Sequence, residues 1–165
     1  MNEYIVDLID KYSPKGVLVD TNVLLLLFMG RFDRKLVGKD NRLSSYVPED
    51  YDILLGLLNK FKTRVTTPNI LTEVSNLSRH LLRDASFNNV FARTAGLLEE
   101  QYVASHKVLS VVELRGFGLA DVATMEVAKH DYLVLTDDFR LRGMLRKQRV
   151  DALNFSEVRF AAWSA

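Results

Sequence analysis

Acidic side chains in apolar surroundings are the part of this sequence best suited to chemistry. Asp20 interrupts the run "KGVLVDTNVLLLLF", which is otherwise almost wholly apolar. An unpaired charge inside a core is costly, so Asp20 either leaves the core or has a partner there. Because it directly follows the short apolar run "GVLV", we expect it to emerge at the end of a buried strand.

Four more acids stand in similar surroundings. Glu73 borders the apolar stripe of a predicted helix, and Asp121 opens a largely apolar helix. Asp137 and Asp138 directly follow the apolar run "YLVL". Taken alone, an aspartate after a strand is most often a helix cap or a turn former, but Glu73 lies inside its helix and cannot be a cap.

Carboxylates gathered at one place would form a site for a hard divalent cation. Three or four of them repel one another, which raises some of their pKa values unless cations are present. An all-oxygen site suits Mg²⁺ or Mn²⁺ and disfavours zinc. Hard divalent ions held by carboxylates are typical of phosphodiester chemistry.

The elements that must position these acids alternate along the chain. Such an alternation implies right-handed crossovers and a parallel sheet covered on both faces, so the expected fold class is α/β. Ligands of open sheets of this kind gather at the carboxyl ends of the strands. We predict strands over residues 16–20, 64–67, 132–136 and 150–155, and helices over residues 2–12, 48–61, 67–82, 88–101, 118–130 and 138–148. Residues 22–28 are helical or buried by composition, and residues 30–45 read as a loop.

Composition limits the class of protein. A chain of 165 residues that is 48% hydrophobic fits one domain with a hydrophobic core. Because its net charge is only +1, any positively charged surface for nucleic acid must be a local patch. The absence of cysteine excludes disulfides, thiolate nucleophiles and Cys-ligated zinc. The acidic N-terminus is unlike a signal peptide, and the longest apolar run, Val23 to Met29, is too short for a membrane helix. We therefore expect a soluble, cytoplasmic protein without a membrane partner.

Four segments, taken in order, resemble the signature segments of the PIN-domain nuclease family. They are "VLVDTNVLL", "TPNILTEVSNL", "GLADVATMEVA" and "YLVLTDDF", and the resemblance runs from about Val17 to Phe155. It implies a three-layer α/β/α sandwich with a central parallel sheet, forming one PIN-like domain over residues 1–165 in which residues 1–14 are an additional N-terminal helix. It also implies Mg²⁺- or Mn²⁺-dependent cleavage of RNA, with 5′-phosphate and 3′-hydroxyl products.

The resemblance further implies roles for particular residues. Adjacent residues leaving a strand point in opposite directions, so either Asp137 or Asp138 is the fourth acid, and the pattern T-x-D favours Asp138. The implied catalytic and metal-binding acids are Asp20, Glu73, Asp121 and Asp138, while Thr21 and Asn22 would orient Asp20 or the attacking water, Thr136 would support the site, and Asp137 is the reserve.

RNA would need positive charge near these acids, since contacts to phosphates give affinity without sequence information. The helix after Asp138 and the loop after the Asp20 segment both carry it, although a solvated helix face is the alternative interpretation. The residues we expect to contact RNA are Arg140, Arg142, Arg146 and Lys147 from the helix, and Arg34 and Lys35 from the loop. None of the three histidines is expected to act.

Other functions and partners remain open. A non-catalytic RNA-binding or scaffold protein of the same fold is one alternative, and a phosphotransfer domain with Asp20 as nucleophile is another. Asn22 stands where the second acid of such a phosphotransfer site would be. The chain is longer than the VapC-type toxins, the smallest members of the family, which weakens the toxin interpretation. A cognate antitoxin or inhibitor protein and a homodimer are the further partners that the resemblance leaves open.

Overall fold

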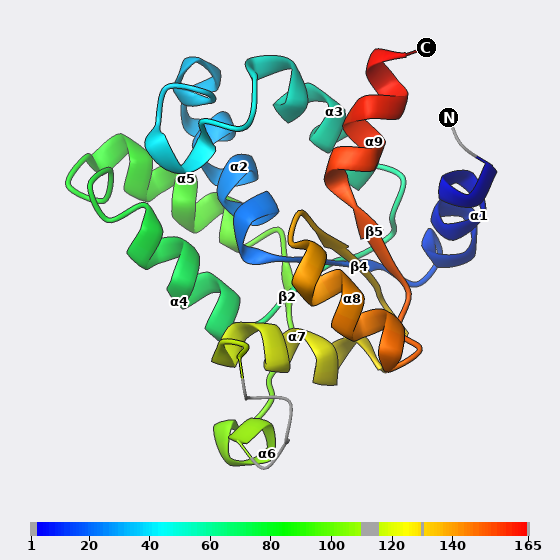
Figure 1. Cartoon of the computed structure of the whole chain (residues 1–165). Coiled ribbons are helices and arrows are strands. Elements are labelled where there is room, and N and C mark those ends of the chain that lie inside the picture. Colours follow the sequence, from blue (N-terminus) through cyan, green and yellow to red (C-terminus); the bar gives the residue numbers. More distant parts are fainter. Residues whose placement is uncertain (1–2, 110–115, 130, 165) are drawn as a thin grey trace.

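A five-stranded parallel sheet forms the centre of the structure, a computed structural model that describes residues 3–109, 116–129 and 131–164 (Figure 1). The strand order is β3-β2-β1-β4-β5, and all four neighbouring pairs are parallel. The chain therefore enters at the middle of the sheet and fills first one side and then the other. The strands are β1 (Val17–Val19), β2 (Arg64–Thr66), β3 (Glu99–Glu100), β4 (Leu133–Thr136) and β5 (Ala152–Asn154).

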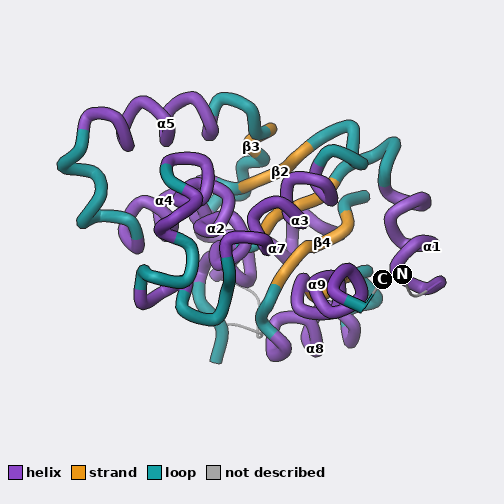
Figure 2. Tube along the Cα trace, turned by 90° about the horizontal axis from the view of Figure 1, so that it is seen from above, coloured by secondary structure: helices purple, strands orange, loops and turns teal. Residues whose placement is uncertain are grey.

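Helices connect and cover the strands, as the alternation in the sequence predicts. Figure 2 shows α4 and α5 at one end of the sheet and α1, α8 and α9 at the other. Within the described ranges, no helix combines the length and the apolar character that crossing a membrane requires. The helices are α1 (Glu3–Tyr12), α2 (Thr21–Phe32), α3 (Pro48–Leu58), α4 (Pro68–Leu77), α5 (Ala85–Ala95), α6 (Ser105–Leu109), α7 (Leu119–Ala128), α8 (Phe139–Lys147) and α9 (Phe155–Trp163), with short 3₁₀ helices η1 (Arg34–Leu36) and η2 (Asn41–Leu43).

Both faces of the sheet are buried. Successive strand residues point to opposite faces, and β4 shows this directly. Leu133 and Leu135 belong to one apolar cluster, together with buried residues of α1, α2, α3 and α9. Val134 belongs to a second cluster, which α7 and α8 complete. This arrangement confirms the expected α/β fold, with helices in layers on both sides of a parallel sheet.

Some element boundaries differ from those expected. The helix predicted over residues 88–101 is wrong at both ends, because α5 covers Ala85–Ala95 and the chain then forms β3. Glu99 and Glu100 pair with Val65 and Thr66 of β2, and this pairing decides their conformation. The sequence of this segment has no apolar pattern that would predict a strand. Helices α6 and α9 were not predicted. Residues 2 and 130, at the ends of two expected helices, lie outside the described residues.

The contact between α2 and α3 yields a test of this packing. A Cβ atom added at Gly30 of α2 would lie 2.4 Å from Cδ2 and 2.7 Å from Cγ of Tyr51 on α3. Gly30→Ala should therefore lower the free energy of unfolding by about 1–3 kcal/mol, although alanine is the better helix former. Chemical denaturation measures the change.

Gly56, an exposed glycine of α3, provides the matched control. A Cβ atom there meets nothing within 4 Å. Gly56→Ala should raise the free energy of unfolding by about 0.5–1 kcal/mol, because alanine restricts the unfolded chain more than glycine does. Equal effects of the two substitutions would contradict the packing of α2 on α3.

Candidate active site at the carboxyl edge of the sheet

Asp20 lies where β1 ends and α2 begins. Its backbone N–H donates to the carbonyl of Leu135 at 2.9 Å, which holds the end of β1 against the end of β4. Its Oδ1 accepts from the backbone N–H of Thr21 at 2.7 Å, and its Oδ2 accepts from the hydroxyl of Thr136 at 2.6 Å. Only 4% of the residue is exposed. Asp20 therefore caps α2 while its carboxylate stays at the buried edge of the sheet.

This carboxylate carries an unfavourable charge. Burial raises the pKa of Asp20 to about 6, although the hydrogen bonds from Thr136 and Thr21 oppose the rise. The negative charges of Asp121 and Asp138 raise it further, so these three acids act on one another. A cation at this place would offset the repulsion.

Glu73 joins the site through Thr21. The hydroxyl of Thr21 donates to Oε2 of Glu73 at 2.8 Å, while the backbone N–H of the same threonine binds Asp20. Glu73 is exposed, contrary to the expected position beside the core. Its helix, α4, turns this side chain toward a pocket of about 380 Å³ that lies between α4 and the start of α7.

Asp121 approaches the same pocket from the opposite side. It is the third residue of α7, and its Oδ2 accepts from the backbone N–H of Gly118 at 3.0 Å. Burial raises its pKa, as do the charges of Asp138 and Glu73, whereas Gly118 and the guanidinium of Arg140 lower it. Asp121 thus has the helix-capping role that any aspartate at this position could have, and it also lies within the electrostatic reach of the other acids.

Asp138 and Asp137 leave β4 in opposite directions. The backbone N–H of Asp138 donates to the hydroxyl of Thr136 at 2.9 Å, and its carboxylate caps α8 by accepting from the N–H groups of Arg140 and Leu141. Thr136 consequently links Asp20 to Asp138. The charge of Asp138 acts on both Asp20 and Asp121.

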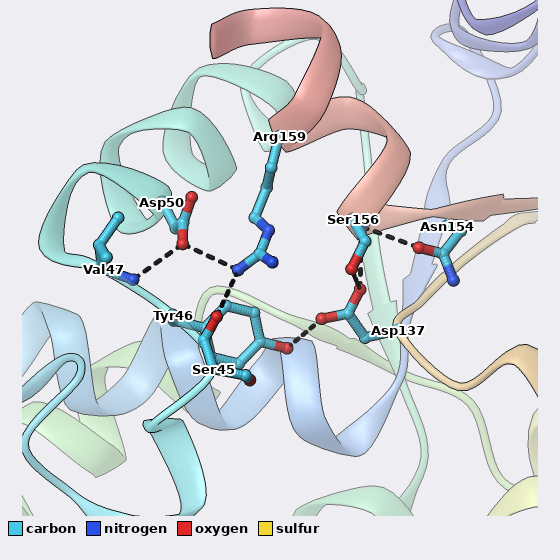
Figure 3. A network of polar contacts seen from close by, with 8 residues as sticks. All are labelled: Ser45, Tyr46, Val47, Asp50, Asp137, Asn154, Ser156 and Arg159. Atoms are coloured by element: carbon cyan, nitrogen blue, oxygen red, sulfur yellow. Dashed lines mark hydrogen bonds and ion pairs between the residues drawn. The ribbon is translucent and has the colours of Figure 1, made fainter.

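Asp137 is engaged in a separate network (Figure 3). Its Oδ2 accepts from the hydroxyl of Tyr46 at 2.6 Å, and its Oδ1 accepts from the N–H and the hydroxyl of Ser156. Burial, and then the charge of Asp137, raises the pKa of Tyr46. Asp137 therefore ties the segment before α3 and the start of α9 to the end of β4.

The same network continues to a half-buried ion pair. Arg159 donates to Oδ2 of Asp50 at 2.8 Å and to the carbonyl of Ser45 at 3.0 Å, and its guanidinium lies 4.9 Å from the ring centre of Tyr46 (Figure 3). Asp50 also accepts from the backbone N–H of Val47, which caps α3. This network braces the layer of α3 and α9 behind the acids.

The residues expected to bind RNA are dispersed. Arg140 lies near the acids. It donates to the carbonyl of Gly116 at 2.7 Å, and its guanidinium lies 5.4 Å from the ring centre of Phe117. Arg142 pairs with Glu157 instead. Arg146, together with Arg142, Arg149 and Phe139, lines a different pocket of about 630 Å³ between α8 and α1.

The remaining expected contacts lie elsewhere. Arg34 is bound by Asp52 at 2.6 Å and by Glu49 at 3.3 Å, so its charge is already compensated. Lys35 and Lys147 are exposed and line none of the pockets described here. Asn22 is also exposed, and its side chain makes no hydrogen bond to any residue that the structure describes. Of the six basic residues, Arg140 acts on Asp121, whose pKa its positive charge lowers.

The donor set fits a hard divalent cation. Asp20, Glu73, Asp121 and Asp138 offer only carboxylate oxygens, the ligands that Mg²⁺ and Mn²⁺ prefer. As the side chains stand, no three histidines, aspartates or glutamates among the described residues lie close enough together to hold a metal ion. Asp121 and Asp138 are turned toward the helix ends that they cap, so binding of an ion would require side-chain rotation.

Several residues of this region were not predicted. Asn69 and Asn76 line the pocket of Glu73, and their spacing of four and three residues from it on one helix could have indicated this. Tyr46 and Ser156 offered no such signal, because their link to Asp137 joins segments far apart in the sequence.

The raised pKa of Asp20 predicts how stability depends on pH without divalent cations. The side chain of Asp20 loses its proton near pH 3.8 in the unfolded chain and near pH 6 in the folded chain. Ionisation of Asp20 therefore lowers the free energy of unfolding as the pH rises from about 4 to about 6. Asp20→Asn should match the unsubstituted chain at about pH 4 and exceed it by up to about 3 kcal/mol at about pH 7. Urea unfolding in EDTA measures the difference. Asp7→Asn, on the exposed face of α1, should show no such trend, and an Asp20→Asn chain that is less stable at neutral pH would contradict the account.

Comparisons with known proteins do not assign this chain to a family. No protein-family model matches the sequence. A search of curated proteins also finds no match. What this chain does must therefore be inferred from its own residues and their contacts.

Proposed function

We propose that this chain is a metal-dependent endoribonuclease that hydrolyses RNA phosphodiester bonds at the carboxyl edge of its sheet. The observation that carries the proposal is a chain of hydrogen bonds linking four side chains and two backbone N–H groups. Thr21 joins Glu73 to Asp20, and Thr136 joins Asp20 to the backbone of Asp138. Asp121 completes the set through its charge. The two threonines thus connect acids that lie at the starts of α2 and α8 and within α4.

Each residue has a defined task in this proposal. Asp20 and Asp121 would hold the cation, with Glu73 and Asp138 beside it. A bound Mg²⁺ or Mn²⁺ supplies a water of lowered pKa and offsets the charge that develops on the phosphate. Thr21 and Thr136 keep Asp20 fixed, so that its carboxylate need not reorganise during the reaction.

The other groups act on the RNA. Glu73 lies in the open pocket, where water and substrate reach it. Arg140 lies beside Asp121 and can bind a phosphate oxygen there. Attack of water on phosphorus, with release of the 3′ oxygen, gives the 5′-phosphate and 3′-hydroxyl ends.

A non-catalytic RNA-binding protein of the same fold is the second candidate. The observation in its favour is that Asp121 and Asp138 both cap helices and do not converge with Asp20 on one point. The phosphotransfer alternative is disfavoured, because Asn22 stands where the second acid of such a site would be. An RNA substrate and a chain without cysteine suit the cytoplasm. An inhibitor protein and a homodimer stay predictions from the resemblance.

Loss of either central acid tests the catalytic role. Asp20→Asn and Asp121→Asn should each lower Mg²⁺- or Mn²⁺-dependent cleavage of single-stranded RNA by a factor on the order of 10² or more, because each removes a charged ligand. Gel analysis of end-labelled RNA measures the rate, and circular dichroism checks that the fold is intact. An undiminished rate in either variant would refute the proposal, whereas RNA binding without cleavage by the unsubstituted chain would favour the second candidate.

The neighbouring acids after β4 form a matched pair for a second test. Asp138→Asn keeps a good helix cap, so it should change stability little while lowering cleavage at least about tenfold. Asp137→Asn removes one of two carboxylate acceptors from Tyr46 and Ser156, so it should lower the free energy of unfolding by about 1–3 kcal/mol. The reverse pattern, with activity lost only in Asp137→Asn, would make Asp137 the fourth acid.

A further inference from the structure

A second pocket, of about 490 Å³, opens beyond the acids at the far end of α4. Its walls come from η2, from the last turn of α4 and from the segment that follows this helix. The residues that line it are Arg42, Asn76, Leu77, Arg79, His80 and Arg83. We name it the arginine pocket.

The arginine pocket carries positive charge that the protein itself does not neutralise. Arg42, Arg79 and Arg83 are exposed, and none of the three side chains forms an ion pair with a described residue. This distinguishes them from Arg34 and Arg142, whose charges acidic neighbours compensate. Three uncompensated guanidinium groups in one hollow favour a ligand with several negative charges.

The fold holds these arginines together. Oδ2 of Asp40 lies 2.9 Å from Nε2 of His80, and Oδ1 of the same residue accepts from the backbone N–H of Arg42 at 2.9 Å. Asp40 thereby ties η2 to the segment after α4, so that Arg42 and Arg79 line one hollow although they lie far apart in the sequence. The only acid in these contacts is occupied in holding the wall.

Asn76 connects the arginine pocket to the acids. It lines both this pocket and the pocket that contains Glu73 and Asp121. Glu73 and Asn76 lie almost one helical turn apart, which corresponds to about 5 Å along α4. A strand of nucleic acid with a phosphate at the acids would thus have a continuous path along α4 to the arginines.

We propose that the arginine pocket is a phosphate-binding subsite for the RNA strand that continues from the cleaved bond. The proposal rests on the ribonuclease function proposed above. It adds a second place where the protein contacts the RNA, reached along α4 from the acids. A guanidinium group can bind two oxygens of one phosphate, and such contacts do not depend on the base sequence. The subsite therefore raises the affinity for RNA that is long enough to reach it. A shorter RNA, which fills only the pocket of Glu73 and Asp121, gains no affinity from the arginines.

The test measures binding separately from cleavage. In the Asp20→Asn background, fluorescence anisotropy with RNA of about a dozen nucleotides reports affinity at several salt concentrations. Arg79→Gln together with Arg83→Gln should weaken binding about tenfold and reduce the salt slope by about 1.4, since each phosphate contact on a single strand contributes about 0.7. Binding of a dinucleotide should not change. Arg42→Gln, in the opposite wall, should show a smaller loss of the same kind and serves if the double variant does not fold.

Lys60→Gln together with Lys62→Gln is the matched control. These exposed lysines lie between α3 and β2, at the amino edge of the sheet, opposite the acids. Their double substitution removes two positive charges, as many as the double arginine variant. An equal loss in this control, or unchanged binding in the arginine variants, would overturn the subsite. If the unsubstituted chain cleaves RNA and the arginine variants bind normally, only the subsite fails. If it cleaves no RNA but binding depends on the arginines and not on the lysines, the subsite stands and the nuclease proposal fails.

Discussion

One buried carboxylate organises the carboxyl edge of the sheet. Asp20 ends the central strand of the sheet, and its charge is held between a backbone N–H group and a threonine hydroxyl in a position that is almost closed to water. Burial alone would make this charge unfavourable, and two neighbouring acids increase the penalty. The fold tolerates Asp20 because two short hydrogen bonds satisfy its carboxylate.

Both sides of the sheet edge follow from this constraint. Thr136 must lie beside Asp20, and the register that pairs Val19 with Leu135 places it there. The side chains of the next two residues point in opposite directions. Asp138 lies on the side of the acids, and Asp137 accepts hydrogen bonds from Tyr46 and Ser156. One strand end thus supplies a group of the candidate site and a fixed support for the layer of α3 and α9.

Much of the fold was predictable from local patterns, and much of the site was not. Short apolar runs bounded by helical periodicity indicate β1, β2, β4 and β5, because a buried parallel strand has few polar residues. The two-residue β3 consists of exposed glutamates, so only its pairing with β2 defines it. The places of Asp20 and Asp138 at strand ends were predictable, because each follows a clear apolar strand. The arginines at the end of α4 could not, since Asp40 and His80 bring them to Arg42 across a loop without any periodic signal.

The most direct measurement is the thermal unfolding of the unsubstituted chain with and without a divalent cation. If the four acids form a site for Mg²⁺ or Mn²⁺, saturating ion should raise the unfolding temperature, because a ligand at 100 times its dissociation constant adds about 2.7 kcal/mol to the free energy of unfolding. In a domain of this size such a gain corresponds to a rise of several degrees, roughly 5–10 °C. Potassium chloride at equal ionic strength should have no such effect, and the rise should disappear in Asp20→Asn. An unfolding temperature that does not respond to either ion, or that rises equally in Asp20→Asn, would contradict the central claim that these carboxylates form one cation site.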